Sequence, residues 1–338
     1  MKRIVLNFLV IVAVVFASCK KENEDFFGDN DVYVAGVLNG QADWGFATVW
    51  KNDVVQNLTD GTNEASANSI YVSNGNVYVA GYVCYEKNSI CIAALWINGE
   101  LQHLTDGTYM AKANSVFVSE NDVYVAGYEE ILFDSGTYES NAKLWINGVA
   151  QNLTDGGIAN SVYISGSNVF VAGTKLWKNG EVQKLPDGTD HPGGNSVFVY
   201  GGDVYVAGSK YDETGWFAKL WKNGVEQYLT DETRMSSANS IYVSNGNVYV
   251  VGNEHYITNV RTIAKLWKND KEQTLNGDRS RGADAMSVYV SGDNVYVVGN
   301  EVGALMDCAP RIWKNGKGYN LKQGKGWAWA NSVFVVEK

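Results

Sequence analysis

From residue 31 onward, short apolar runs with alternating polar positions are separated by turn residues such as Asn-Gly and Gly-Asp. Residues 67–72 and 77–81 are β-rich runs joined through Asn74-Gly75, and residues 94–104 hold a second pair of runs around Asn98-Gly99. Asn-Gly between such runs favours a type I′ hairpin, because both central residues of that turn need positive φ. The pattern therefore predicts four short strands, paired as two hairpins, in this part of the chain.

The same four-strand unit recurs seven times, with a period of about 45 residues and one shorter unit of about 35. Each unit holds an Asp/Asn-Val-Tyr-Val-Ala-Gly-like segment, which starts at residues 31, 76, 122, 168, 203, 247 and 294. Each also holds a Trp before a second turn, at Trp50, Trp96, Trp145, Trp177, Trp221, Trp267 and Trp313. Four strands per repeat of this length is typical of a β-propeller blade.

Residues 31–338 therefore resemble a seven-bladed β-propeller, an all-β fold with four antiparallel strands per blade, in the broad company of WD-repeat and kelch proteins. The Gly-His and Trp-Asp pair of the former, the paired glycines of the latter and the Asp-box of sialidase-type propellers are missing. The resemblance therefore implies an architecture and no specific functional family.

The hairpin register predicts how the ring closes. A two-residue turn at Asn74-Gly75 pairs Tyr71 with Tyr78, and six units carry such an aromatic pair. The seventh pair is divided between Tyr33, in the first segment, and Phe334, in the last. We expect the C-terminal strand to complete the first blade and Phe334 to pack on Tyr33, which leaves no open sheet edge between the termini.

Strands that run up and down place their connections alternately on two faces of the disc. The strand 1–2 and 3–4 turns define a turn face, and the strand 2–3 loops and blade-to-blade links define a loop face. The loop face carries nearly all the length variation, from almost nothing at Gly173-Thr174 to about fourteen residues at 128–141. We expect the working surface on the loop face, because binding residues concentrate in variable loops on a rigid scaffold.

Several Trp and Arg residues fall outside the repeat and belong to this face. The candidate ligand-binding residues are Trp44, Trp216, Arg279, Arg281, Arg311, Trp327 and Trp329. We expect Trp44, Trp327 and Trp329 to meet at the seam where the last and first blades join. Exposed Trp rings suit a sugar face or a peptide, and Arg presents a fork suited to carboxylate, sulfate or phosphate. The alternative is that Arg balances neighbouring acids and that the Trp residues pack within strands.

An Asn recurs near the start of six inner strands, and Met286 replaces it in the seventh. We expect these Asn side chains to bond backbone groups rather than a ligand. The set is Asn68, Asn114, Asn160, Asn195, Asn239 and Asn331.

Composition narrows the chemistry. A net charge of −10 disfavours a nucleic-acid partner, and 3 His and 4 Cys disfavour a His- or Cys-rich metal site. No nucleophile, zinc-protease or phosphate-loop motif is present, so we expect no cofactor, metal or enzyme activity. Cys84 and Cys91 flank one strand 2–3 loop and suit a disulfide, whereas Cys308 is left over.

Residues 1–18 have a positive start, Lys2 and Arg3, and then a short apolar run, as in a secretory signal peptide. The end of this run, Phe16-Ala17-Ser18-Cys19, resembles the lipobox of bacterial lipoproteins. The resemblance implies that Cys19 is lipidated, that residues 19–30 form a tether to the membrane, and that the address is the cell envelope as an outer-membrane lipoprotein, on either face of that membrane. The alternative is an ordinary secretory signal.

The sequence thus favours a lipid-anchored β-propeller that acts as a non-catalytic binding module for a glycan, a peptide, a protein or an anionic group. The alternative is a surface enzyme, a hydrolase or lyase acting on polysaccharide, with its site on the loop face. A third interpretation is a scaffold or spacer without a specific ligand.

Overall fold

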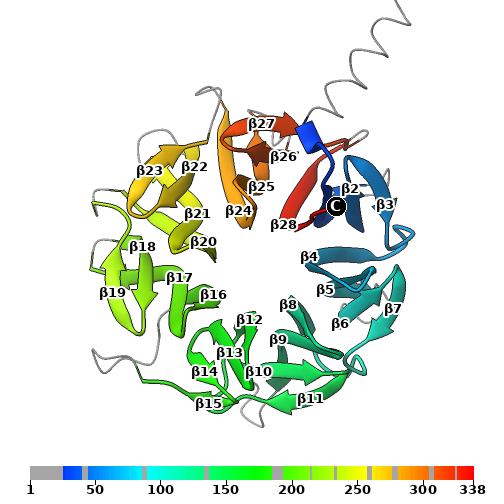
Figure 1. Cartoon of the computed structure of the whole chain (residues 1–338). Helices are drawn as coiled ribbons and strands as arrows, with labels where there is room; N and C mark the ends of the chain where they lie inside the picture. The colour runs from blue at the N-terminus through cyan, green and yellow to red at the C-terminus, as the bar shows by residue number, and fades with distance from the viewer. Residues whose placement is uncertain are drawn as a thin grey trace, which may run out of the picture.

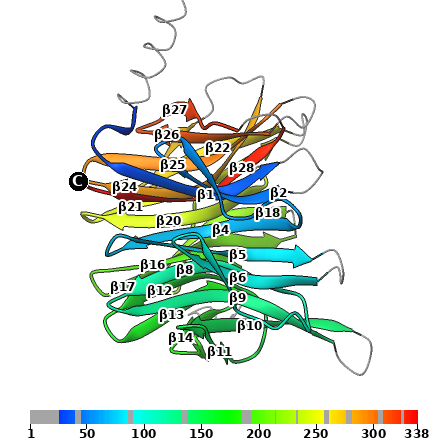
Figure 2. The ribbon, with the colours of Figure 1, turned by 90° about the vertical axis from the view of Figure 1, so that its right-hand side faces the viewer.

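The protein is a closed seven-bladed β-propeller, seen along its axis in Figure 1 and from the side in Figure 2. The computed structural model describes residues 26–39, 45–85, 90–132, 137–184, 193–213, 215–231, 234–256, 261–275, 281–303, 308–323 and 326–338. Each blade is a four-stranded antiparallel sheet, as the repeat predicts. Within the described residues, no helix is long and apolar enough to cross a membrane.

The strands of each blade are given from the axis outward. Blade 1 holds β28 (Ala328–Val336), β1 (Asp31–Asn39), β2 (Gly45–Lys51) and β3 (Val54–Asn57). Blade 2 holds β4 (Glu64–Ser73), β5 (Asn76–Tyr85), β6 (Ile90–Ile97) and β7 (Glu100–His103), and blade 3 holds β8 (Ala111–Ser119), β9 (Asp122–Leu132), β10 (Tyr138–Ile146) and β11 (Val149–Asn152). Blade 4 holds β12 (Ala159–Ser165), β13 (Asn168–Gly173), β14 (Leu176–Lys178) and β15 (Glu181–Val182).

The remaining three blades follow the same order. Blade 5 holds β16 (Gly194–Tyr200), β17 (Asp203–Asp212), β18 (Gly215–Lys222) and β19 (Val225–Tyr228). Blade 6 holds β20 (Ser236–Ser244), β21 (Asn247–Tyr256), β22 (Arg261–Lys268) and β23 (Lys271–Thr274). Blade 7 holds β24 (Gly282–Ser291), β25 (Asn294–Val302), β26 (Cys308–Lys314) and β27 (Lys317–Asn320).

The repeated turn residues have a visible structural reason. In blade 2 the second turn places Asn98 at φ 52°, in the left-handed region that Asn tolerates. Its Oδ1 accepts a bond of 2.9 Å from the Val77 amide, and its Nδ2 donates to Asn76. The same pair of bonds occurs in all seven blades, which explains why an Asp or Asn opens every second strand. The Trp of each third strand is fully buried between neighbouring blades.

The ring closes as predicted. Strand β28 pairs with β1 in blade 1, with Asp31 opposite Val336 and Tyr33 opposite Phe334. The chain therefore enters and leaves the ring on the turn face, where the C-terminus is marked at the left of Figure 2. The predicted register is confirmed.

The predicted ring stacking within each hairpin is wrong. Phe334 contacts Tyr71 and Tyr289, each at 4.8 Å between ring centroids, rather than its hairpin partner Tyr33. The inner-strand aromatics touch one another all round the ring, at 4.6–4.9 Å. They do so because the inner strands converge on the axis and bring equivalent residues of neighbouring blades together.

Two further belts join the inner strands. In every blade a Ser Oγ accepts from the next inner strand, as Ser69 does from the Val116 amide at 3.1 Å. Each of the six repeated Asn side chains donates to a backbone carbonyl of the next blade, as Asn68 does to Ala113 at 2.9 Å. The expected structural role of these Asn residues is confirmed.

Two sequence interpretations need correction. The long loop expected at 128–141 is mostly strand, because β9 and β10 continue pairing as far as Leu132 opposite Tyr138. In the expected tether, Phe26 and Phe27 are buried instead, and both pack on Tyr319 of blade 7. These two Phe side chains belong to a core cluster shared by blades 7 and 1, so the folded body begins before residue 31.

Candidate functional site

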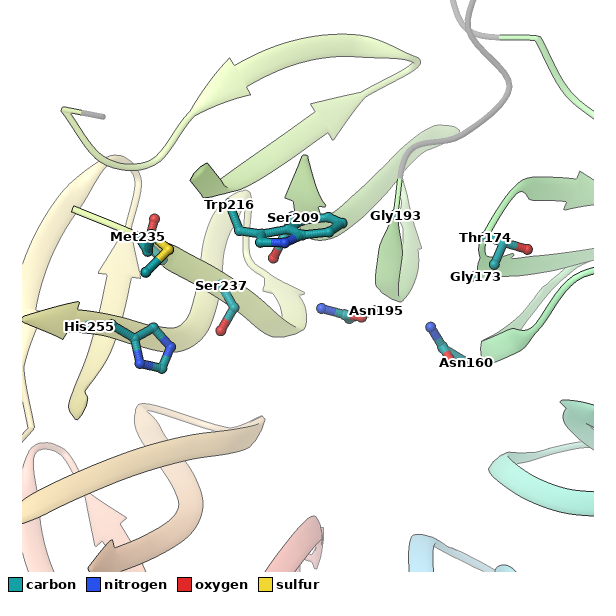
Figure 3. A pocket seen from close by; sticks show the side chains of 11 residues that line it. Asn160, Gly173, Thr174, Gly193, Asn195, Ser209, Trp216, Met235, Ser237 and His255 are labelled. Carbon is teal, nitrogen blue, oxygen red and sulfur yellow. The ribbon is translucent and has the colours of Figure 1, made fainter. Parts of the chain in front are cut away.

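Two cavities on the loop face are lined by ligand-binding candidates from the sequence analysis. The first cavity, of about 530 Å³, lies at the mouth of the central channel between blades 4, 5 and 6 (Figure 3). The second cavity, of about 390 Å³, lies between blades 1 and 2. Another cavity, of about 360 Å³, lies on the turn face between blades 4 and 5. The first cavity falls within the size range of small-molecule sites.

The first cavity exists because blade 4 is short. Only Thr174 and Lys175 separate β13 from β14, so this blade raises no wall beside the channel. In blade 5 the corresponding hairpin is long, and it carries Tyr211 opposite Trp216. These two rings make an edge contact at 5.4 Å, and 61% and 53% of their surfaces are exposed.

The floor of the first cavity is polar and uncharged. Asn160 and Asn195 donate their amide nitrogens to the neighbouring blades, which leaves both amide oxygens as acceptors near the channel (Figure 3). Ser209, below Trp216 in Figure 3, has a buried hydroxyl with no hydrogen-bond partner among the residues that the structure describes. Thr174, Ser237 and His255 complete the polar lining. The described lining residues include no Asp, Glu, Lys or Arg.

The second cavity has a different lining. Trp327 and Trp329 approach from the start of β28, and Glu64 and Tyr82 come from blade 2. The Tyr82 hydroxyl donates to Glu64 Oε1 at 3.4 Å. Burial, with the nearby Glu64 charge as a second cause, raises the pKa of Tyr82 to about 12. The phenol therefore stays protonated and able to donate at neutral pH.

The structure brings only some of the sequence candidates together. Trp327 and Trp329 share the second cavity, whereas Trp216 lies beside the first. Arg311 pairs with Glu301 at 2.6 Å, bonds Asn320 at 3.1 Å, and is only 18% exposed. Three candidates lie outside the described residues: Cys19, Trp44 and Arg279.

Arg281 lies in blade 7, beside Gly303, where an added Cβ would stand 2.7 Å from its guanidinium. No described Arg lines either loop-face cavity. The described residues therefore do not form the expected combination of Trp faces and Arg forks.

A repeated basic position in the third strand of the blades was not predicted from the sequence. Five blades place a basic side chain just before the Leu-Trp or Ile-Trp of the third strand, and each basic group pairs with an acid. The pairs are Lys143 with Glu129, Lys175 with Asp155, Lys219 with Glu226, Lys265 with Glu254, and Arg311 with Glu301. The recurring Lys-Leu-Trp tripeptide in the sequence could have revealed this position. Arg311 belongs to this set, which explains why it is engaged inside its blade.

Cys84 and Cys91 face each other across β5 and β6 and form a disulfide. Cys308 is buried in blade 7 and lies outside that bond. Among the residues that the structure describes, no group of three or more His, Cys, Asp or Glu is placed to hold a metal ion.

Comparison with known proteins supports the fold and does not identify a function. No protein-family model matches the sequence, and no curated protein matches it. The structure is similar to an acylaminoacyl peptidase of Pyrococcus horikoshii, with a TM-score of 0.53, 12% identity, and coverage of 87% of this chain and 51% of that chain. A Mycobacterium tuberculosis puromycin-hydrolyzing peptidase gives a TM-score of 0.55 and 12% identity, with coverage of 88% and 52%.

A third similar structure is the β-propeller domain of the Trilobed protease from Pyrococcus furiosus, with a TM-score of 0.48, 10% identity, and coverage of 87% and 92%. The chain spans about half the length of the first two peptidases. At these identities the similarity concerns the fold alone.

Proposed function

We propose that this protein is a non-catalytic binding propeller whose first cavity takes a glycan. The observation that carries the proposal is Trp216, which stands 53% exposed beside a cavity of about 530 Å³. Beyond its edge contact with Tyr211, more than half of the Trp216 surface stays open, and exposed apolar surface beside a cavity supports a binding role. The flat apolar ring can cover one face of a sugar.

The polar floor supports the same ligand class. A sugar presents several neutral hydroxyl groups, each able to donate and to accept. The floor offers acceptor oxygens on Asn160 and Asn195. The lack of charged groups in the described lining favours a neutral ligand over an anion.

The small number of carboxylates in the two loop-face cavities favours a binding function over hydrolysis of a glycosidic bond. Cleavage of a glycosidic bond generally uses two carboxyl groups on either side of that bond. Among the described lining residues of the two loop-face cavities, Glu64 is the single carboxylate. The similarity to peptidases adds no cleavage activity to the proposal, because this chain spans about half of their length.

Trp216→Ala should weaken glycan binding about tenfold, since loss of a stacking ring typically costs about 1–3 kcal/mol. A glycan array on wild-type protein identifies the ligand, and calorimetry then compares the variants. Tyr200→Ala is the matched control, because Tyr200 is an exposed aromatic at a turn of blade 5, on the opposite face. Equal affinities for wild type and Trp216→Ala would reject the first cavity as the site.

We also propose that the protein is held at the cell envelope through Cys19. The support is the signal-like run at residues 1–18 and the lipobox-like end before Cys19. Cys19→Ser should abolish incorporation of an alkyne-labelled fatty acid and move the protein from the membrane to the soluble fraction. Cys308→Ser is the control and should keep the label. Labelling of Cys19→Ser at the wild-type level would contradict the proposal.

A further inference from the structure

The second cavity is lined by two Trp side chains and a carboxylate. Trp329 lies opposite Val37 in the β1–β28 ladder, and the Trp327 carbonyl accepts from the Asn39 amide at 2.9 Å. Both side chains line the cavity from one strand, two positions apart. Gly45 of β2 also lines the cavity, where an added Cβ would clash with Val37 and stand 3.5 Å from the Trp327 ring.

The neighbouring aromatic ring, Tyr82, already contacts a cation. Lys112 of blade 3 places its Nζ 4.3 Å from the centroid of that ring. An aromatic face attracts a cation because its quadrupole is negative there, and Trp attracts it more strongly than Tyr does. Tyr82 therefore has one face occupied and its hydroxyl turned to Glu64, while the two Trp side chains line open space.

Glu64 differs from the partly buried acids in other blades. Glu129, Glu254 and Glu301 each pair with the repeated base of their own blade. In the two blades that flank the second cavity, the equivalent positions hold Thr48 and Ala94, so neither supplies a base. Within the described part of the chain, the contact recorded for the Glu64 carboxylate is the neutral Tyr82 hydroxyl.

We propose that the second cavity binds an organic ammonium group, with the cation between Glu64 and the faces of Trp327 and Trp329. The proposed ligand is a cation, whereas the Arg residues expected at this seam would have favoured an anion. The described lining holds no Lys or Arg to attract an anion, and an uncharged sugar would leave the carboxylate without a counter-charge. The net charge of −10 also draws cations toward the protein.

The test uses choline and its uncharged isostere, 3,3-dimethylbutan-1-ol, on the full chain at low salt, with binding measured by calorimetry and Trp fluorescence. Choline should bind at least about tenfold more tightly than the isostere, because only the charged ligand gains the cation–π and carboxylate terms. Ethanolamine as a third ligand distinguishes a quaternary from a primary ammonium preference, and either preference supports the proposal.

Glu64→Gln should lower choline affinity about tenfold, because the substitution removes the charge and keeps the shape. Trp329→Leu should lower it by about fivefold through loss of one aromatic face. Trp216→Ala should leave choline binding unchanged, which separates this site from the proposed glycan site. Equal binding of choline and the isostere, unchanged affinity in Glu64→Gln, or no binding of either amine up to about 10 mM would overturn the proposal.

Discussion

Replacing Gly81 with Ala should lower the free energy of unfolding by about 3 kcal/mol or more, since a core side chain with no room forces backbone to move. Gly81 lies in the middle of β5, and its φ is outside the left-handed region. A Cβ there would stand 2.9 Å from the Ser66 carbonyl carbon, closer still to its oxygen, and 3.1 Å from the ring of Trp96. Neither the inner-strand backbone nor a fully buried Trp can give way easily.

Gly75→Ala is the control for this prediction. Gly75 has φ +76° and open space around its Cβ position, so Ala there meets only backbone strain of about 1 kcal/mol. Urea unfolding followed by Trp fluorescence compares the two variants. Equal midpoints for Gly81→Ala and Gly75→Ala would show that the inner strand can shift without penalty.

Asp53→Gly should destabilise the protein by about 2–3 kcal/mol, because it leaves partly buried donors at the closing seam without their fully buried acceptor. The Asp53 side chain is 0% exposed and accepts from the hydroxyl of Tyr319, in β27 of blade 7, at 3.0 Å and from the amide of Lys322, just after β27, at 2.7 Å. The effect arises even though Gly suits the backbone, since Asp53 has φ +67° and five other blades have Gly at this turn position.

Asp270→Gly is the matched control, since Asp270 has the same φ of +67° in the same turn of blade 6. Its carboxylate accepts a hydrogen bond from the exposed side-chain amide of Gln227, at the protein surface. We expect this variant to be neutral or more stable by up to about 1 kcal/mol. The melting temperature should therefore fall for Asp53→Gly and stay unchanged or rise for Asp270→Gly, and a shared loss would mean that the turn, not the seam, needs Asp.

The fold was predictable because each blade repeats the same residues that form its turns and its packing contacts. Asn at each second turn, Trp in each third strand and an aromatic in each inner strand act within a unit or between adjacent units. The split pair of Tyr33 and Phe334 then predicted the closure, which the register confirms. Regular hairpin turns made this register unambiguous.

The site was harder to predict, because loops that are far apart in sequence meet only in the ring. Nothing local to Gly173-Thr174 shows that a short blade opens a cavity beside Trp216. Nothing local to Arg311 shows that Glu301 engages it, except the repeated base position that needs several blades to be compared. Some glycines also have a role other than forming turns. Seven of them lie within second strands, where the bulged inner strand passes too close for a Cβ: Gly36, Gly81, Gly127, Gly173, Gly208, Gly252 and Gly299.

The closure in blade 1 also determines how the molecule responds to force. Strands β1 and β28 are antiparallel, and the first residue of β1 is opposite the last residue of β28. Once Phe26 and Phe27 have left Tyr319, a pull between the two ends of the propeller loads the Asp31–Val336 pair first and opens the β1–β28 ladder one pair at a time. Because the eight closing pairs open in sequence, the ring should yield at low force in a single-molecule stretching experiment, where a high-force rupture would indicate shear instead.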